Sequence, residues 1–381
     1  YDAVMRTLLR SVAELAILPI QDLLGYGGDT KMNHPGIAKG NILENGKLKV
    51  TVNGNGTVDV LNKETGKLYK SLNYMTSQGE VGNAWAHKTP EFDRKYNTLG
   101  AAARIYVTES GALTGSIVCE YEFELPESCQ VNPSDIYKKM PVKVTYTLDD
   151  GADSLKVKVE VDNNIKDHWF RANFPTDIAT DVSIADSHFD IVRRAIEIPD
   201  STGWVEQAFG THPLRTFAAV TDGENGFAVM PKGLFEYEVF DDTTMALTMI
   251  RACRIKLAVS EEKITELEDE GVQCPGKQTF EYALNFFRND YNVLPNKAAE
   301  YFAPVKCAVC GVILVEQEVI PVRDFNEGII PLSALEVSCG DYEPNGGASE
   351  GPAHLAVDGN PATMWHTDWE GTSRANHWFQ F

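Results

Sequence analysis

The chain has 381 residues, of which 43% are hydrophobic and 10% aromatic, so it can bury one large core or two ordinary ones. Its 34 Lys and Arg residues against 55 Asp and Glu residues give a formal net charge of −21, which repels nucleic-acid phosphates and anionic lipid surfaces. No apolar run reaches the roughly 20 residues of a membrane-spanning helix. We therefore expect neither nucleic-acid binding nor membrane insertion. Residue 1 is not Met, and localisation stays open, with an extracellular or cell-surface place among the options.

The first residues predict a helix. Apolar side chains recur at helical spacing from Tyr1 to Leu15, charged residues lie off that stripe, and the pattern ends before Pro19. A turn-rich connector, residues 25–36, follows.

From residue 41 the pattern becomes that of β-strands. Residues 48–52 alternate apolar and polar side chains, the chain turns through the Asn-Gly-Asn-Gly of residues 53–56, and the alternation resumes at residues 58–60. The clearest strand is residues 154–162, where four apolar side chains share one face and four charged ones share the other. Further runs of strand character are 103–108, 114–125, 142–148, 184–196, 215–221, 226–230, 234–240, 245–250 and 279–287. So many strands with little helical pattern between them predict a mainly β fold, a large antiparallel β-sandwich.

Motifs of self-contained catalysis are absent from the sequence. It has no Gly-x-Ser-x-Gly elbow, no phosphate-binding glycine loop and no His-Glu-x-x-His helix. Seven cysteines, an odd number, argue against a complete disulfide framework. His168, in a strand-like stretch, is interpreted as a hydrogen-bonded structural residue rather than a ligand. No catalytic residue can be chosen from the pattern alone.

Seven stretches, in this order, resemble one family, the C-terminal β-sandwich of glycoside hydrolase family 38, the α-mannosidases. The resemblance covers residues 41–305. The stretches are LENGKLKVTVNGNGTVDVLNKETGKLY, GEVGNAWAHKTP, KDHWFRANFPTDI, FDIVRRAIEIPD, FAAVTDGENGFAVMPKGLFEYEV, MALTMIRA and KQTFEYALNFF.

The resemblance implies an enzyme of two parts. An N-terminal α/β barrel holds zinc and an aspartate nucleophile, a helical bundle follows, and the sandwich helps to close the active site. The reaction is hydrolysis of α-mannosides with retention. By this resemblance, residues 1–24 are the tail of the bundle, and the nucleophile and zinc ligands lie upstream of residue 1. The chain's partners would be its own N-terminal barrel and α-mannosides or related glycans, and the chain alone is expected to be inactive.

Three residues are candidates for substrate binding on the same resemblance. Trp85 matches an aromatic residue that reaches the sugar, and a flat ring suits the apolar face of a pyranose. The alternative is that Trp85 belongs to the sandwich core. Arg193 or Arg194 matches an arginine directed at the active site, where a guanidinium can donate to two hydroxyls. Adjacent strand residues face opposite ways, so at most one of the two arginines serves this role.

The last segment, residues 334–381, resembles the first third of a discoidin or coagulation factor type C domain of the carbohydrate-binding family 32 kind. The matching pieces are AVDGN at 356–360, TMWHT at 363–367 and HWFQF at 377–381. An Asp-Gly-Asn turn presents oxygen ligands to a hard cation, so we expect a structural calcium that involves Asp358 and Thr363. Residues 306–333 form the expected linker. The alternation at 378–381 indicates a strand with no later segment to pair with, as in an incomplete β-sandwich module.

The sandwich alone leaves a second function open. A non-catalytic glycan-binding or adhesion protein could be built from the same sandwich, because a fold does not fix a function.

Overall fold

The computed structural model describes residues 36–83, 87–204, 208–240, 243–254, 270–288, 290–303, 336–339, 350–358, 362, 364–365 and 379–380. The chain divides into two compact units, residues 1–308 and 309–381. The helix predicted near the N-terminus and the linker predicted at 306–333 lie outside the described residues. In the described part of the chain, no helix is long and apolar enough to cross a membrane.

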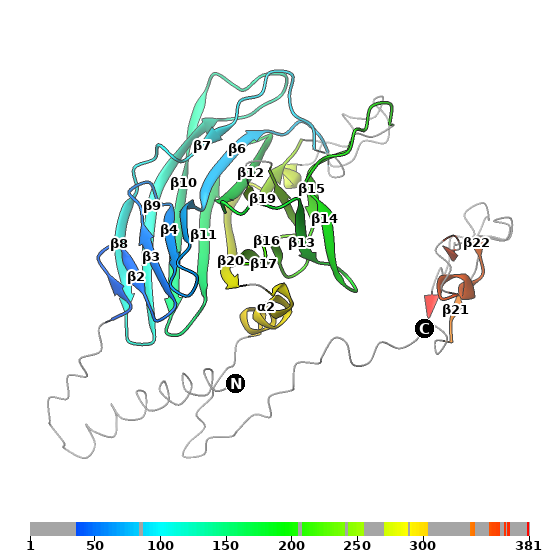
Figure 1. Ribbon diagram of the computed structural model, residues 1–381. Helices are drawn as coiled ribbons and strands as arrows, with labels where there is room; N and C mark the ends of the chain where they lie inside the picture. The colour runs from blue at the N-terminus through cyan, green and yellow to red at the C-terminus, as the bar shows by residue number, and fades with distance from the viewer. Residues whose placement is uncertain are drawn as a thin grey trace, which may run out of the picture. The chain divides into compact units, whose positions relative to one another are not determined.

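The described residues of the first unit form three antiparallel sheets (Figure 1). The five-stranded sheet runs in chain order: β1 (Ala38–Lys39), β2 (Ile42–Glu44), β3 (Leu48–Val52), β4 (Val58–Asn62) and β5 (Leu68–Leu72). The nine-stranded sheet has the order β14 (Ile191–Ala195), β13 (Val182–Asp186), β16 (Ala218–Thr221), β17 (Asn225–Lys232), β20 (Gly276–Arg288), β11 (Ser154–Asn163), β10 (Tyr137–Asp149), β9 (Thr114–Pro126) and β8 (Arg104–Ser110). The six-stranded sheet has the order β15 (Thr211–Pro213), β18 (Glu236–Val239), β19 (Thr244–Ala252), β12 (His168–Pro175), β6 (Tyr74–Gly79) and β7 (Tyr96–Asn97). The predicted mainly β, antiparallel fold is confirmed.

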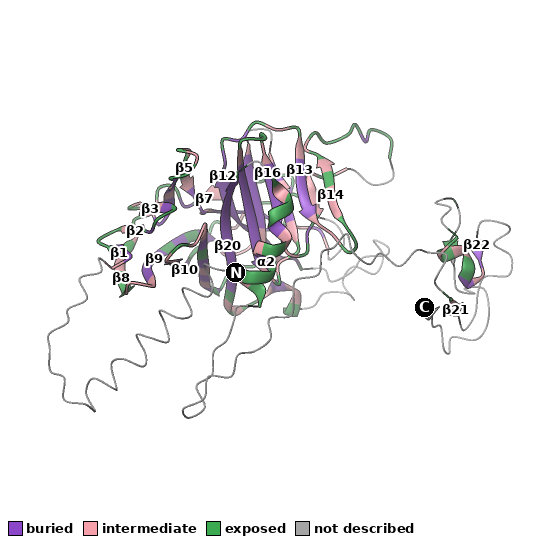
Figure 2. Ribbon diagram, turned by 60° about the horizontal axis from the view of Figure 1, so that its bottom comes forward, coloured by how far each residue is buried: buried purple, intermediate pink, exposed green. Residues whose placement is uncertain are grey.

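One apolar core joins the three sheets. The alternation predicted for residues 154–162 appears in β11, where Val157 lies opposite Tyr282 and Val159 opposite Phe280 of β20. These side chains are buried in the same cluster as residues of the five-stranded and six-stranded sheets. Each such side chain contributes about 1.5–3 kcal/mol by leaving water. The nine-stranded sheet is therefore covered by the other two sheets on this face (Figure 2).

The chain passes from the five-stranded to the six-stranded sheet at residues 71–73. Ser71 and Asn73 both have left-handed backbone conformations, with φ of 53° and 70°. Asn73 tolerates this region better than most residues, and here its side chain adds buried hydrogen bonds. Its amide donates to the Tyr146 hydroxyl at 2.8 Å, and Tyr146 donates to the Gly56 carbonyl at 2.7 Å. This polar cluster fixes how the two sheets meet inside the core.

A short helix, α2 (Leu294–Phe302), covers the opposite face of the nine-stranded sheet. Its buried residues Leu294 and Ala298 pack in a second apolar cluster with Phe217 and Phe287. The 3-10 turn η3 (Tyr291–Val293) leads into it, and the Asp290 side chain caps that turn. The sequence patterns did not predict this helix.

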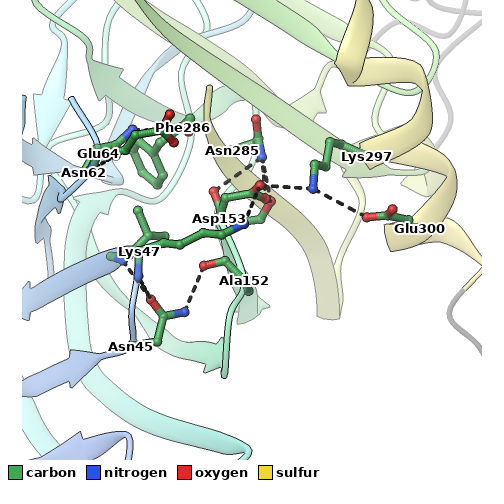
Figure 3. A network of polar contacts seen from close by, with 12 residues as sticks. Asn45, Lys47, Asn62, Glu64, Ala152, Asp153, Asn285, Phe286, Lys297 and Glu300 are labelled. Atoms are coloured by element: carbon green, nitrogen blue, oxygen red, sulfur yellow. Dashed lines mark hydrogen bonds and ion pairs between the residues drawn. The ribbon is translucent and has the colours of Figure 1, made fainter. Parts of the chain in front are cut away.

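A charged network fastens α2 to the sheets (Figure 3). Asp153, in the turn before β11, pairs with Lys297 of α2 at 3.0 Å and with Lys47 of the β2–β3 turn at 3.4 Å. Asn285 of β20 also donates to the Asp153 carboxylate, at 3.2 Å. Burial raises the pKa of Asp153, but the two lysines outweigh burial and bring it below its ordinary value.

One predicted strand is two strands. Residues 184–196 read as a single run, whereas the structure has β13 and β14 with a turn at 187–190 between them. The backbone N–H of Ser187 donates to the Asp190 carbonyl at 3.0 Å, and the Asp190 side chain accepts from the N–H of Ile191. Phe189, at the tip of this turn, is fully exposed. Its apolar side chain made the turn resemble part of a continuous strand in the sequence.

The described residues of the second unit form two short strand pairs. β21 (Ser338–Cys339) pairs antiparallel with β24 (Phe379–Gln380), and β22 (Glu350–Gly351) pairs parallel with β23 (Met364–Trp365). A 3-10 turn, η5 (Ala353–Ala356), lies between β22 and β23 in sequence. The expectation that the last strand has nothing to pair with is wrong, because its partner β21 precedes it in the chain.

Candidate functional site

Strand β12 carries one charged side chain, Arg171, into a buried surface. Phe170, Ala172 and Phe174 face the shared core, while the alternate residues Trp169 and Arg171 lie on the other face of the six-stranded sheet. Both are nevertheless buried, with 4% and 3% of their surfaces exposed. An arginine is seldom buried unless it is paired, so the partners of Arg171 explain how this face accommodates a charge.

Arg171 is held by an acid and two aromatic rings. Its guanidinium donates to Glu238 of β18 at 2.5 Å and to the Gln78 side chain of β6 at 3.3 Å. The guanidinium carbon lies 3.8 Å from the Trp169 ring centre and 5.2 Å from that of Phe240. Burial lowers the pKa of Arg171, and Glu238 offsets only part of that effect. An arginine remains charged even so, and stacking on aromatic faces stabilises it.

The same face continues across β19 and β18 with hydrogen-bonded polar groups. The Trp169 indole donates to the Thr248 hydroxyl at 2.9 Å, and that hydroxyl donates to Glu236 at 2.7 Å. Gly210 lies so close that an added Cβ would come within 2.8 Å of the Glu238 carboxylate. A side chain at that position would displace Glu238 from its contact with Arg171.

A fully buried acid, Glu80, follows directly after β6. Its side chain has no exposed surface, and its two oxygens accept from four donors. One oxygen accepts from the backbone N–H groups of Gly82 at 2.7 Å and Lys88 at 3.2 Å. The other lies 2.6 Å from His87 Nδ1 and 3.3 Å from Arg251 Nε of β19. Glu80 therefore ties both limbs of the loop 81–88 to the sheet.

The residues around Arg171 and those around Glu80 both contact Trp169. The His87 ring centre lies 4.1 Å from that of Trp169, the residue on which Arg171 also stacks. Arg251 is the register partner of Trp169 in β19. We call this set, Glu80, His87, Trp169, Arg171, Glu238 and Arg251, the charged face.

The predicted substrate residues fall into three cases. Trp85 lies outside the described residues, between Asn83 and His87 of the loop 81–88. Arg193 is exposed on the edge strand β14. Arg194 is half-buried, and its guanidinium lies 3.5 Å from the Tyr237 hydroxyl. Burial and the charge of Arg194 lower the pKa of the nearby His212.

A cleft lies beside the charged face, where β6 runs on beyond its pairing with β7. Gln78, Arg94, Lys166, Asp167 and His168 are among its lining residues. Burial raises the pKa of Asp167, although the Gln273 side chain donates to its carboxylate at 2.7 Å. The cleft thus adjoins the charged face through Gln78.

His168 is a structural residue, as predicted. It lies between the Ser77 hydroxyl and the Asn163 side chain, each at 3.1 Å from a ring nitrogen. Burial lowers its pKa to about 3, so the ring is neutral at physiological pH. A neutral histidine with both nitrogens engaged is fixed in place rather than free to bind a ligand.

Comparison with known proteins identifies the family. Residues 43–256, more than half of the chain, match the family model described as "Glycosyl hydrolases family 38 C-terminal domain". The chain belongs to glycoside hydrolase family 38. A curated relative, named "Putative mannosylglycerate hydrolase", from Halalkalibacterium halodurans, is 28% identical over 304 residues, which are 74% of this chain and 32% of that protein.

Solved structures of family 38 share the fold. An α-mannosidase from Enterococcus faecalis V583 is 24% identical with a TM-score of 0.65, over 70% of this chain and 32% of that chain. A further family 38 protein from Enterococcus faecalis is 23% identical with a TM-score of 0.64, over 70% of this chain and 33% of that one. The chain therefore spans about a third of the length of these relatives.

Two metals are expected from the sequence, zinc in the whole enzyme and calcium in residues 334–381. Zinc is implied for whole enzymes of family 38, but no described group of three or more His, Cys, Asp or Glu side chains could hold a metal ion. The described residues therefore do not fit a zinc centre. Asp358, an expected calcium ligand, is exposed, and Thr363 lies outside the described residues.

Sequence reasoning did not find the charged face. Glu80 and Arg171 lie inside two of the stretches that carry the family 38 resemblance, GEVGNAWAHKTP and KDHWFRANFPTDI. The available signal was a charge at a strand position flanked by apolar residues, as in Phe170-Arg171-Ala172. Such a charge can face solvent or a buried partner, and only the fold distinguishes the two.

Proposed function

We propose that this chain is the sandwich portion of a longer α-mannoside hydrolase that acts with retention of configuration. The observation that carries the proposal is the family 38 match over residues 43–256, together with a chain that spans about a third of its relatives. The zinc and the aspartate nucleophile would belong to a barrel elsewhere in the parent protein. There the nucleophile forms a glycosyl-enzyme intermediate, which water then hydrolyses.

The sandwich would supply contacts to the sugar and to the barrel. We place Trp85 against the apolar face of the mannose ring and Arg193 on its hydroxyls. Arg193 is favoured over Arg194 because Arg193 is exposed, whereas Arg194 is half-buried near Tyr237. The name of the Halalkalibacterium halodurans relative makes mannosylglycerate one α-mannoside to test.

The second unit would be a carbohydrate-binding module of the discoidin kind, with a structural calcium that involves Asp358 and Thr363. Asp358 is exposed, two residues after the end of η5. Calcium titration of the chain and of D358A, followed by thermal unfolding, tests this. Calcium should raise the unfolding temperature of the unsubstituted chain only.

The function is tested on the parent protein with a panel of α-mannosides that includes mannosylglycerate. We expect hydrolysis by the parent protein and none by the 381-residue chain alone. W85A and R193A should lower kcat/KM by about tenfold or more, while R194A, the matched control, should stay within about twofold.

Two outcomes would contradict parts of this proposal. W85A within about twofold of wild type would remove Trp85 from the site. A parent protein that binds glycans but hydrolyses no α-mannoside would instead support the alternative, a non-catalytic glycan-binding or adhesion protein.

A further inference from the structure

Glu80 is unusual among the described acids in the completeness of its burial. Its carboxylate has no exposed surface, and it accepts from two backbone N–H groups, one imidazole and one guanidinium. A carboxylate can only accept hydrogen bonds, so His87 Nδ1 carries the proton that it donates. All the acceptor sites of the carboxylate are thus used, which is what makes such burial possible.

Stability alone does not account for this arrangement. Removing an ion pair from water costs several kcal/mol per ion, and well-packed apolar residues in the same volume often stabilise a fold as well or better. What apolar residues cannot do is fix backbone N–H groups and a ring at defined positions. The buried carboxylate therefore specifies geometry more than it adds stability.

The geometry it specifies is that of the loop 81–88. Glu80 accepts from Gly82 on one limb and from Lys88 on the other, and the N–H of Val81 donates to the Lys88 carbonyl at 2.9 Å. Arg251, which pairs with Glu80, also donates to the Asn83 carbonyl. One buried carboxylate and one guanidinium thus hold both limbs of the loop.

The held limbs are close together in sequence. Only three residues separate Asn83 from His87, and the middle one is Trp85. His87 is fixed twice, by Glu80 at Nδ1 and by the Trp169 ring on which it packs. Functional groups on loops work best when a rigid scaffold sets the positions of the loop ends.

We propose that Glu80 is a positioning residue of the sugar site: together with Arg251 it fixes residues 81–83 and 87–88, on either side of Trp85, for binding of the mannoside. This role rests on the function proposed above. A loop contact made equally in the bound substrate and in the transition state changes KM and leaves kcat nearly unchanged. Glu80 touches no reacting atom, so its loss should appear in binding.

The test is E80Q in the parent protein. Glutamine keeps the side-chain length but turns one acceptor oxygen into a donor, which opposes the N–H groups of His87 and Arg251. We expect KM to rise about fivefold or more with kcat within about twofold. Amide hydrogen exchange at Gly82 and Lys88 should become faster. E80D, which retains the carboxylate, should recover part of both effects.

The matched control is D153N, which alters another ion-paired carboxylate, one that is partly buried, at a different place in the fold. It should lower the unfolding temperature without changing KM or exchange at Gly82. If E80Q does not fold, H87F, which removes the imidazole donor but keeps a ring against Trp169, is measured in its place with the same expectations.

The outcomes separate the possible failures. Unchanged exchange at Gly82 and Lys88 would show that Glu80 does not hold the loop. Faster exchange with an unchanged KM would show that the loop does not bind the sugar. Absence of wild-type turnover would overturn the proposed function and this role with it, while the exchange result would still report on the loop itself.

Discussion

Replacing Arg171 should be among the most damaging single changes on the charged face. R171M keeps much of the apolar stem but leaves the Glu238 carboxylate, whose side chain is 15% exposed, without its partner. Breaking a fully buried pair costs about 3–5 kcal/mol, and loss of a desolvated cation–π contact adds about 1–2 kcal/mol. Because Glu238 keeps some contact with water, we expect the lower part of that range, a loss of about 3 kcal/mol in the free energy of unfolding.

A double-mutant cycle separates the pair from its surroundings. Urea unfolding of the 381-residue chain at pH 7 is compared for R171M, E238Q and R171M/E238Q. The double variant should cost clearly less than the sum of the single ones, with a coupling of about 2 kcal/mol. The exposed pair Lys139–Glu122, at 2.7 Å with both side chains more than half exposed, is the control and should show little or no coupling. Equal coupling free energies at the two pairs would refute the view that burial makes the Arg171–Glu238 interaction the stronger one.

Three further predictions concern stability. His168 has a pKa of about 3 when folded and about 6.5 when unfolded, so the unfolded state binds more protons between these values. Lowering the pH below 6.5 should then reduce the free energy of unfolding by up to about 1.4 kcal/mol per pH unit from this group, and H168Q should flatten that slope in urea titrations. Asp153 has a lowered pKa, so its stabilisation is present above the unfolded value near 4 and is lost as the pH falls through the folded value. D153N should remove that acid-side loss and detach α2, seen as faster amide exchange at Lys297. Y146F should lower the free energy of unfolding by about 1–3 kcal/mol, because the Gly56 carbonyl loses a buried donor, whereas a tyrosine-to-phenylalanine change at the surface should be near neutral by the same urea measurement.

The strands could be predicted from the sequence where one face of the strand is buried and the other is exposed to solvent. In β11, four apolar side chains alternate with charged ones, and the burial pattern follows that alternation. In β12, both faces are buried, and polar residues (His168, Arg171 and Asn173) stand among the apolar ones without a regular alternation. The partner of Arg171, Glu238, lies 67 residues further along the chain, a pairing that no local pattern contains.

The remaining differences have similar causes. Helix α2 has nine residues and is held by packing against the sheet and by Lys297, so its own sequence gives a weak signal. The last strand pairs with β21, about forty residues earlier, and only the fold reveals that contact. For the site, the loop that carries Trp85 could be chosen by its family 38 resemblance, but the buried acid that holds it could not.

The most direct test of the account is to follow the first anomer of mannose released by the parent protein from an α-mannoside, by proton NMR in the first minutes of reaction. Hydrolysis with retention predicts that α-mannose forms first and then equilibrates with the β-anomer. Release of β-mannose first, or no release of mannose at all, would contradict the assignment of this chain to a retaining α-mannoside hydrolase.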